Sequence, residues 1–275
     1  MSDAFLPDGT FEGTSALVTG GGTGLGLAVS LRLARLGASV VCASRDPAHH
    51  TDLIEIARRE RLAVRSVTLD VRDAKACRRA VRAAADAFGG VDVLINNAAG
   101  NFIRPSLLLA PEAFRSVIDI ALNGVFFMSR EAARVMRGRG GAIVNVSAPY
   151  ARDGKPGVVH SACAKAGVEA MTRTLAAEWA PLGIRVNAVS PGPFESTGAA
   201  DRLWPSDELR REVLGQIPAG RFGRTEEIAE LVCFLASDRA AWINGSILLV
   251  DGGWSLPEPL VAADAPVRRR RRPAG

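Results

Sequence analysis

The chain has 275 residues, of which 48% are hydrophobic, and its formal net charge is +5. This composition excludes a globally disordered chain, because it supplies enough apolar side chains for a large core. No run of about 18 or more apolar residues occurs, and the first residues lack a basic and then an apolar region, so we expect neither a membrane span nor a secretory signal.

The positive charge is concentrated near the C-terminus, where Arg268–Arg272 form one run. Subtracting these five arginines from the net charge of +5 leaves zero, so the rest of the chain is close to neutral. A basic tail can bind nucleic acid or an anionic membrane, but no nucleic-acid-binding motif accompanies it. We therefore expect a solvated tail and no nucleic-acid partner.

The four cysteines and three histidines are scattered along the chain, without the spacing of a metal-binding cluster. We therefore expect no metal site. Cysteines without a disulfide-like pattern are typical of the reducing cytosol, which predicts a cytoplasmic protein with reduced thiols.

The N-terminal half alternates short β-branched runs with helical patterns, which predicts βαβ units and a parallel sheet. The predicted strands are Ser15–Thr19, Ser39–Ala43, Val64–Leu69, Val91–Asn96, Ala142–Val146, Arg185–Ser190 and Ser246–Val250. The predicted helices are Gly24–Leu36, a segment ending near Arg59, Asp73–Phe88, Pro111–Arg137, Ser161–Trp179, Asp207–Gln216 and Thr225–Ala236. Between them, the Gly- and Pro-rich segment Pro191–Pro205 predicts a loop that could act as a lid.

The simplest assembly of these elements is an α/β fold. We predict a single-domain Rossmann-type doubly wound parallel sheet of about seven strands flanked by helices. This domain would span residues 13–254, after an N-terminal extension of residues 1–12. Residues 255–275 would form an Arg-rich, disordered C-terminal tail.

The segment Thr19–Gly26, T-G-G-G-T-G-L-G, lies between the first predicted strand and its helix, which is the context that a phosphate-binding turn requires. Glycines let a pyrophosphate approach the backbone, and the helix N-terminus adds free N–H groups and partial positive charge. A glycine-rich turn can also simply end a strand, but here the strand, turn and helix agree. We predict a nucleotide cofactor bound by Gly20, Thr23, Gly24, Leu25 and Gly26.

The end of the second predicted strand indicates which nucleotide is bound. An NAD site usually has an acidic residue there, whereas this chain has Ser44 and Arg45, and a guanidinium suits the 2′-phosphate of NADP. The adjacent Asp46 argues against this, unless it belongs to the start of the next helix. We predict NADP(H) over NAD(H) by about 10- to 100-fold, since a charge-assisted pair contributes roughly 1.5–3 kcal/mol.

The segment Asn145–Lys165 is the candidate for the chemistry. It follows a predicted buried strand and contains Tyr150, the only tyrosine, and Lys165. Both residues should lie near the carboxyl end of a strand, where α/β sheets place their ligands.

Together with the glycine motif, N-N-A-A-G at Asn96–Gly100 makes the chain resemble the short-chain dehydrogenases/reductases over roughly residues 13–254. The resemblance implies a contact of Asp70 and Val71 with the cofactor's adenine, a P-G-P loop beside the nicotinamide and a homotetramer. Further cofactor-binding residues that it implies are Asn97, Ala98, Ala99, Gly100, Lys165, Pro191, Gly192, Pro193 and Phe194.

The chain departs from the family pattern at one informative position. The usual pair is Tyr-x-x-x-Lys, but the residue four before Lys165 is Ser161. In the common mechanism, the lysine lowers the tyrosine pKa and the tyrosine protonates a carbonyl oxygen. A serine hydroxyl is too weak an acid to replace that tyrosine, which argues against ordinary alcohol–ketone chemistry.

The 2,4-dienoyl-CoA reductases share this departure, and the chain is similar to them in N-A-A-G-N-F, S-A-C-A-K-A-G-V-E-A-M and P-G-P-F-E-S-T-G-A. In the mitochondrial type, a tyrosine lies fifteen residues before the lysine, as Tyr150 does here, and an asparagine matching Asn101 pairs with it on the thioester oxygen. The peroxisomal type has instead an aspartate where this chain has Ala121.

The resemblance therefore implies NADPH-dependent reduction of a 2,4-dienoyl-CoA to an enoyl-CoA, in the β-oxidation of unsaturated fatty acids. It makes Tyr150, Lys165 and Asn101 the catalytic residues, with Lys165 on the nicotinamide ribose. Ser161, Asn123 and Ser147 would support them.

Several alternatives stay open. The chain could reduce another acyl-CoA, such as a trans-2-enoyl-CoA, whose reductases it also resembles in V-H-S at Val159–Ser161, or a 3-oxoacyl substrate. It could also be an inactive NADP-binding sensor or scaffold. Tyr150 could instead pack as a loop residue, and Asn101 could merely cap a turn.

Overall fold

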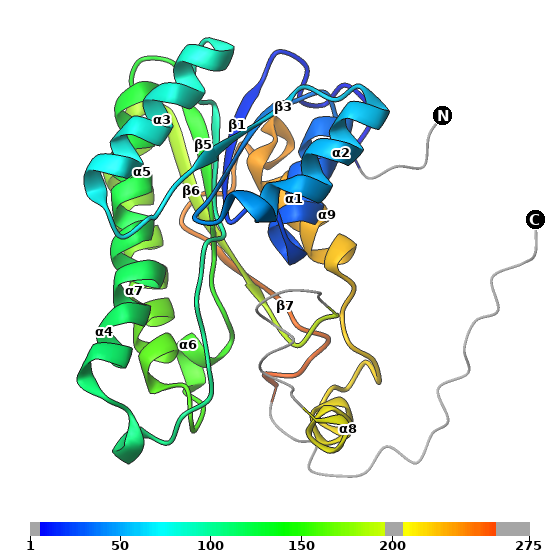
Figure 1. Ribbon diagram of the computed structural model, residues 1–275, viewed down its shortest axis with the longest axis vertical. Helices are drawn as coiled ribbons and strands as arrows, with labels where there is room; N and C mark the ends of the chain where they lie inside the picture. The colour runs from blue at the N-terminus through cyan, green and yellow to red at the C-terminus, as the bar shows by residue number, and fades with distance from the viewer. Residues whose placement is uncertain (1–5, 196–205, 257–275) are drawn as a thin grey trace, which may run out of the picture.

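A parallel β-sheet forms the centre of the molecule. The computed structural model describes residues 6–195 and 206–256, and in this part of the chain seven parallel strands form one sheet of order β3-β2-β1-β4-β5-β6-β7 (Figure 1). The predicted fold class is confirmed. The strands are β1 (Ser15–Thr19), β2 (Ser39–Ser44), β3 (Val64–Thr68), β4 (Val93–Asn96), β5 (Gly141–Val146), β6 (Ile184–Pro191) and β7 (Ile247–Val250).

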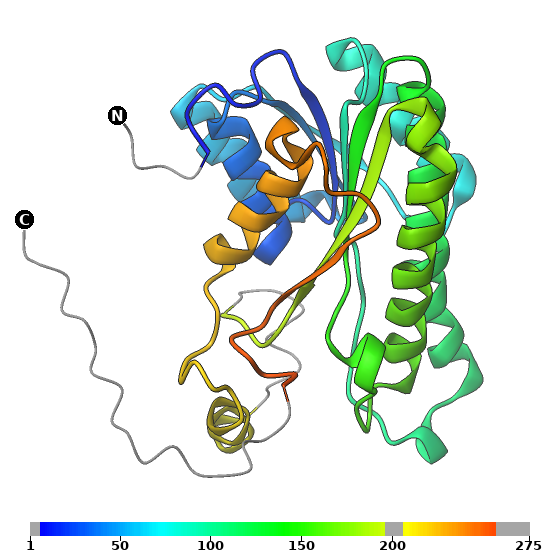
Figure 2. The same cartoon turned by 180° about the vertical axis from the view of Figure 1, so that it is seen from behind.

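Helices cover both faces of this sheet, as Figures 1 and 2 show. One layer contains α1 (Gly24–Arg35), α2 (Thr51–Glu60) and α9 (Thr225–Ala236). The opposite layer contains α3 (Ala74–Phe88), α5 (Gly124–Met136) and α7 (Val159–Trp179). The shorter helices α4 (Pro111–Ile118), α6 (Tyr150–Asp153) and α8 (Asp207–Gly215) lie toward the edge of the sheet where β4, β5 and β6 end.

The strands β1, β2 and β4 are almost wholly buried because helices cover both faces of the sheet, whereas β3 at the edge has three exposed residues. All five residues of β1 are buried. Leu17 packs into the core under α3, α5 and α7, whereas its neighbour Val18 packs into the core under α1 and α9. This explains why the strands appear in the sequence as continuous β-branched runs rather than as alternating patterns.

Local signals fix both ends of α3 where the sequence predicts them. The Asp73 carboxylate accepts a hydrogen bond from the Lys75 N–H at 2.8 Å and caps the start of α3. Gly89, with φ +80°, ends the same helix in the left-handed conformation that glycine adopts without strain.

Two predicted segments differ from the structure in a way that matters for function. The helix predicted over Pro111–Arg137 contains one wider π-helical turn, Asp119–Asn123, between α4 and α5. The loop predicted after β5 contains α6, and α7 begins at Val159, two residues before the predicted start. The loop predicted over Pro191–Pro205 lies partly, and the arginine run Arg268–Arg272 wholly, outside the described residues.

The described part of the N-terminal extension is packed against the domain. Leu6 and Phe11 are buried in the core beside α1, and the Phe11 N–H donates to the Leu36 carbonyl at 2.9 Å. Cys42, Cys77 and Cys233 are buried free thiols, and burial raises the pKa of Cys42 and Cys77 to about 12.

Two other kinds of feature are absent from the described residues. None of their helices has the length and apolar character needed to cross a membrane. Nor do they contain a group of three or more His, Cys, Asp or Glu residues that could hold a metal ion.

Candidate active site

The turn between β1 and α1 has the shape of a phosphate-binding loop. Gly20 has φ +63°, and a Cβ on Gly26 would lie 2.0 Å from the Gly20 carbonyl oxygen, so only glycine fits at position 26. Thr23, at the start of α1, makes no side-chain cap, and Gly24 and Leu25 follow it in the first turn. The turn therefore presents backbone N–H groups at a helix N-terminus, which fits a nucleotide pyrophosphate.

The N-N-A-A-G segment after β4 braces this turn. The Asn97 side chain donates to the carbonyls of Thr19 and Gly20, each at 3.1 Å. The Thr19 hydroxyl accepts from the N–H groups of Asn97 and Ala98, also at 3.1 Å. Ala99 and Gly100 continue in the same segment toward Asn101, which joins the predicted nucleotide loop to the predicted catalytic residue.

The end of β2 is followed by Arg45, which is exposed, and by Asp46, whose carboxylate accepts a hydrogen bond from the backbone. Asp46 accepts from the Ala48 N–H at 2.9 Å and caps the short 3₁₀ helix that precedes α2. The Ser44 hydroxyl is buried and lies 2.6 Å from His50 Nε2. Within the described residues the Arg45 side chain makes no hydrogen bond or ion pair, so it is available for an anion at this edge.

Asp70, the residue predicted at the adenine, is paired with Arg72. The Arg72 guanidinium donates to both Asp70 oxygens, with a shortest N···O distance of 2.5 Å. These hydrogen bonds, and more weakly the nearby charge of Arg45, hold the pKa of Asp70 below its usual range. Val71 between them is buried in the core, so the carboxylate is fixed and ionised beside the end of β2.

Three segments bring Tyr150, Asn101 and Ser161 together. The Asn101 amide nitrogen donates to the Tyr150 hydroxyl oxygen at 3.1 Å, and the Ser161 hydroxyl lies 3.1 Å from the same atom. Asn101 Oδ1 accepts from the Phe102 N–H at 2.9 Å, which turns the amide NH₂ group toward Tyr150. The residues come from the loop after β4, from α6 and from the first turn of α7.

Tyr150 is held as a neutral phenol. Burial raises its pKa above the usual value, and the hydrogen bonds with Ser161 and Asn101 offset this only in part. The phenol therefore keeps its proton at neutral pH and is suited to donate a hydrogen bond to a developing negative charge.

Lys165 lies one helical turn beyond Ser161, on the same face of α7. Its side chain is buried, and Nζ donates to the Val146 carbonyl, at the end of β5, at 2.6 Å. Burial lowers the pKa of Lys165 to about 8. The Tyr150 hydroxyl is hydrogen-bonded to Ser161 and Asn101, whereas Lys165 donates to Val146. Among the described residues, no hydrogen bond joins Tyr150 directly to Lys165.

The two other supporting residues are engaged with acidic partners. The Ser147 hydroxyl donates to Glu169 at 2.8 Å, which directs it toward α7 rather than toward Tyr150. Asn123 closes the π-helical turn, and its amide donates to Asp119 at 2.9 Å. A π-turn inside a helix often marks a functional position, and this one faces α7.

The Pro191–Phe194 loop reaches the same edge of the sheet from β6. The Gly192 N–H donates to the Val250 carbonyl at 3.1 Å, and a Cβ on Gly192 would lie 2.5 Å from the Asp251 Cβ. Pro193 and Phe194 then pair with Gly223. The predicted cofactor residues thus lie at the ends of β1, β2, β3, β4 and β6, with Lys165 on α7.

The role of α6 and several contacts around Tyr150 are not predicted by the sequence. The segment Tyr150–Asp153 lies between Pro149 and Gly154, and this Pro-before, Gly-after pattern is a helix signal that could have been used. The ring of Phe102 packs edge-on against buried His160, with 4.3 Å between ring centroids, and so supports the neighbours of both Asn101 and Ser161. No spacing rule in the sequence indicates that contact.

The chain matches known proteins over most of its length. A family model described as "Enoyl-(Acyl carrier protein) reductase" matches residues 20–255. The chain is 44% identical, over 90% of its length and 99% of the relative, to a probable 2,4-dienoyl-CoA reductase [(2E)-enoyl-CoA-producing] of Bacillus subtilis. It is 40% identical, over 93% of its length and 88% of the relative, to a peroxisomal 2,4-dienoyl-CoA reductase [(3E)-enoyl-CoA-producing] of Pongo abelii.

A solved structure gives the same result at the level of the fold. A putative 2-deoxy-d-gluconate 3-dehydrogenase from Agrobacterium tumefaciens with bound NADP superposes with a TM-score of 0.82 at 35% identity, covering 90% of this chain and 98% of that one. Together with the glycine turn, the N-N-A-A-G segment and the seven-stranded sheet, these matches show that the chain belongs to the short-chain dehydrogenase/reductase family.

Proposed function

We propose that this chain is an NADPH-dependent reductase of 2,4-dienoyl-CoA thioesters. The observation that carries the proposal is the pairing of the Asn101 amide with the Tyr150 hydroxyl at 3.1 Å, with Ser161 in the place of the usual family tyrosine. Two hydrogen-bond donors fixed side by side suit an oxygen that becomes negative during the reaction. Relatives named as 2,4-dienoyl-CoA reductases support the same substrate class.

The proposed reaction adds a hydride and then a proton to the conjugated diene. Bound NADPH would supply the hydride to the terminal carbon of the diene. As that C–H bond forms, the electron pair of the diene moves through the conjugated system to the thioester oxygen. Asn101 and Tyr150 donate hydrogen bonds to this oxygen, and a later proton on carbon gives an enoyl-CoA with one fewer double bond.

The protonation states of this chain's own residues support those roles. The raised pKa of Tyr150 keeps its phenol neutral, so it donates a hydrogen bond without giving up its proton. Lys165, with a pKa of about 8, is mostly cationic at neutral pH and would bind the nicotinamide ribose. Ser161 orients Tyr150 rather than acting as an acid.

The preference for NADP(H) rests on the end of β2. Arg45 is exposed there, and Asp46, which would repel a 2′-phosphate, is held in the cap of the following 3₁₀ helix. A relative with bound NADP supports the same nucleotide. The remaining cofactor contacts are those given above for Gly20–Gly26, Asp70 and Val71, Asn97–Gly100 and Pro191–Phe194.

A second candidate is reduction of a trans-2-enoyl thioester, which the matched family's description as an enoyl reductase favours. Tyr150 and Asn101, the pair of the mitochondrial type, favour the diene. Ala121, where the peroxisomal type has an aspartate, is buried against α7 and offers no carboxylate. The two named relatives differ in their products, (2E) and (3E), so both product positions belong to the test.

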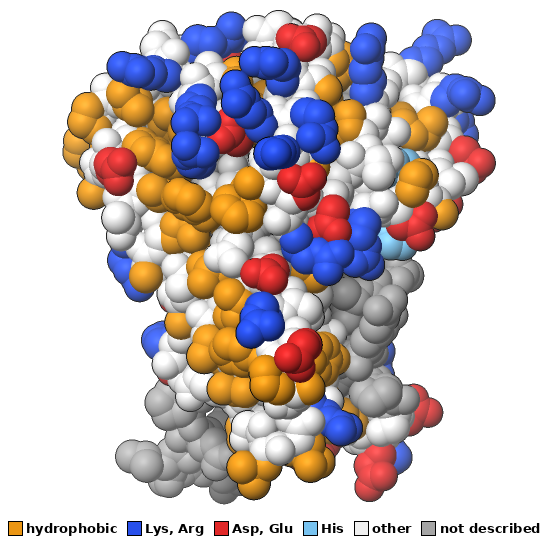
Figure 3. Space-filling view, turned by 60° about the vertical axis from the view of Figure 1, so that its left-hand side comes forward, with side chains coloured by type: hydrophobic (Ala, Val, Ile, Leu, Met, Phe, Trp, Pro, Cys, Tyr) orange, Lys and Arg blue, Asp and Glu red, His pale blue; other side chains and the backbone are white. Residues whose placement is uncertain are grey.

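We also expect a cytoplasmic homotetramer. Figure 3 shows apolar side chains gathered on the side of the molecule that carries α3, α5 and α7, below a band of Lys and Arg side chains. Phe126 on α5 is 42% exposed, and apolar side chains gathered on one face are typical of a surface that binds another protein. Sedimentation of the purified protein would give the number of subunits, and a stable monomer would refute this expectation.

The direct test uses 2,4-hexadienoyl-CoA and NADPH. We expect NADPH absorbance to fall and the thioester to gain two hydrogens, with the double-bond position read by NMR. A protein that binds NADPH but reduces no acyl-CoA would instead support the sensor or scaffold function.

A further inference from the structure

The loop before α9 is hydrogen-bonded to the predicted nicotinamide loop. The Gly223 N–H donates to the Pro193 carbonyl at 3.0 Å, and the Glu195 N–H donates to the Gly223 carbonyl at 2.9 Å. Gly223 therefore pairs with the backbone on both sides of Phe194, as one rung of a parallel bridge. Next to it, the Thr225 hydroxyl donates to the Glu195 carbonyl at 2.5 Å.

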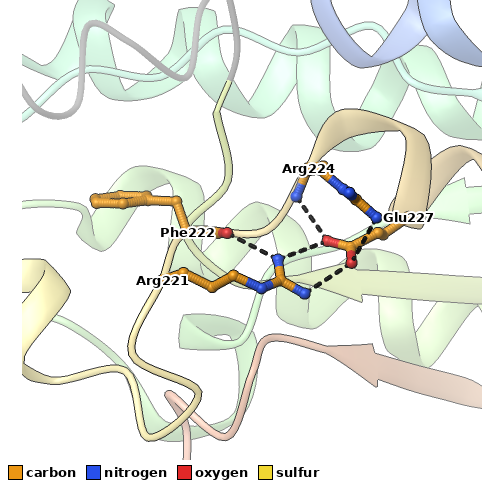
Figure 4. Close-up of polar contacts among 4 residues, drawn as sticks. All are labelled: Arg221, Phe222, Arg224 and Glu227. Atoms are coloured by element: carbon orange, nitrogen blue, oxygen red, sulfur yellow. Dashed lines mark hydrogen bonds and ion pairs between the residues drawn. The ribbon is translucent and has the colours of Figure 1, made fainter. Parts of the chain in front are cut away.

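One carboxylate, that of Glu227, holds the residues around Gly223, as Figure 4 shows. The Arg221 guanidinium donates to its two oxygens at 2.8 and 2.7 Å. The Arg224 N–H donates to it at 2.8 Å, which caps the start of α9. Arg221 also donates to the Phe222 carbonyl at 3.0 Å, so the residues before and after Gly223 are tied to one side chain.

The helix that carries Glu227 is itself firmly attached. α9 packs along α1 and against β5 and β6. The Arg32–Glu230 ion pair, at 2.6 Å, joins α9 to α1. At the other end, Arg185 on β6 donates to the Leu235 carbonyl at 2.8 Å. Glu227 therefore belongs to a helix that is held in place by several contacts, whereas Gly223 lies in a loop.

From these contacts we propose that Glu227 and Arg221 are positioning residues for the cofactor: they fix Gly223, and through it the Pro191–Phe194 loop, in the geometry that the nicotinamide requires. This inference rests on the proposed cofactor role of that loop. Neither side chain needs to touch the cofactor. Their effect passes through two backbone hydrogen bonds, so it should appear in cofactor affinity and turnover more than in global stability.

The contacts of Glu227 with Arg221 and Arg224 do not form a pH switch. Hydrogen bonds from Arg221 and the Arg224 N–H lower the pKa of Glu227 to about 2. The charge of Arg224 lowers this pKa further, and Glu195 acts on Arg221 rather than on Glu227. Its effect should therefore be the same from about pH 5 to pH 9, because the carboxylate is ionised throughout.

The chain offers a matched control for the test. Arg35 and Glu60, on α1 and at the end of α2, form a bidentate pair with the same distances, 2.7 and 2.8 Å. The two carboxylate side chains are equally exposed, 30% for Glu60 and 31% for Glu227. Glu60→Ala thus removes a similar surface ion pair without touching the cofactor loop. Glu227→Gln keeps one side-chain oxygen that can accept from the Arg224 N–H, but it loses the paired hydrogen bonds from the Arg221 guanidinium.

The first readout is hydrogen exchange in the protein without cofactor. We expect Glu227→Ala to speed exchange at the amides of Gly223 and Glu195 by about three- to tenfold, because loss of an exposed charged network opens local structure by this order. Glu60→Ala should leave these amides unchanged, and Glu227→Gln should give an intermediate rate. Unchanged exchange in Glu227→Ala would overturn the proposal.

The second readout is NADPH affinity, followed by nucleotide fluorescence, together with kcat and KM. We expect Glu227→Ala to raise the Kd for NADPH and lower kcat by about three- to tenfold, in proportion to the exchange rates, while Glu60→Ala matches the wild type. Equal losses in Glu227→Ala and Glu60→Ala would overturn the proposal. If the wild type bound no NADPH, the proposed function would fail, while the exchange data would still decide whether Glu227 fixes the loop.

Discussion

The substitution Tyr150→Phe removes one oxygen and leaves the ring in place. The hydroxyl has hydrogen-bond partners in Asn101 and Ser161, each at 3.1 Å, and both can turn to solvent or substrate when it is lost. We therefore expect a stability cost of only about 1 kcal/mol. The cost to the reaction should be larger, about 10²- to 10³-fold in kcat, because an oxyanion donor acts in the transition state.

The assay follows NADPH absorbance with 2,4-hexadienoyl-CoA, beside a fluorescence titration that measures the Kd for NADPH. Tyr150→Phe should change kcat and leave that Kd within about twofold, since the hydroxyl bonds Asn101 and Ser161 and not the cofactor loop. Ser161→Ala is the matched control, because it breaks the contact with Tyr150 but keeps both proposed donors, and it should lose no more than about tenfold. Full turnover by Tyr150→Phe, or an equal loss in Ser161→Ala, would refute the reasoning.

Five further outcomes are expected. Asn101→Ala should lose about 10²-fold in kcat, with unchanged NADPH affinity, and a normal rate would remove Asn101 from the mechanism. Lys165→Ala should weaken both NADPH binding and turnover, and wild-type kinetics would contradict its role. In the wild type, NADPH affinity should fall as pH rises through about 8, where Lys165 loses its charge, and this step should be missing in Lys165→Met. The temperature of thermal unfolding should not fall with NADPH affinity over this pH range. Burial lowers the pKa of Lys165 from 10.5 to about 8, so loss of its proton makes the folded state more stable as pH rises from about 8. Arg45→Ala should reduce the preference for NADPH over NADH by about tenfold, measured as the ratio of kcat/KM, and an unchanged ratio would contradict the role of Arg45.

The fold could be predicted almost completely from the sequence because its signals are local. The strands are short runs of β-branched residues, each followed by an amphipathic helix with a recognisable end, such as Asp73 before α3 and Gly89 after it. An element without a local sequence signal could not be predicted. The π-turn at Asp119–Asn123 has no pattern of its own, since it is an extra residue accommodated in a helix that packs on α7.

The candidate site could be predicted less completely, because its contacts join distant parts of the chain. The roles expected for Tyr150 and Lys165 come from the family resemblance, in which a tyrosine lies fifteen residues before the lysine. The contact of Tyr150 with Ser161 depends instead on how α6 turns back onto α7. The pairing of Asp70 with Arg72 is local and could have been anticipated from two residues of opposite charge. The bridge from Gly223 to Phe194 could not, since nothing in either segment indicates the other.

The most direct test of the central claim compares substrates rather than variants. The wild-type enzyme should be given 2,4-hexadienoyl-CoA, crotonyl-CoA and acetoacetyl-CoA in parallel, each with NADPH and with NADH, and kcat/KM measured for every pair. Asn101 and Tyr150, without a tyrosine at position 161, predict the highest kcat/KM for the dienoyl thioester with NADPH and the lowest for the ketone. A preference for acetoacetyl-CoA would contradict the account.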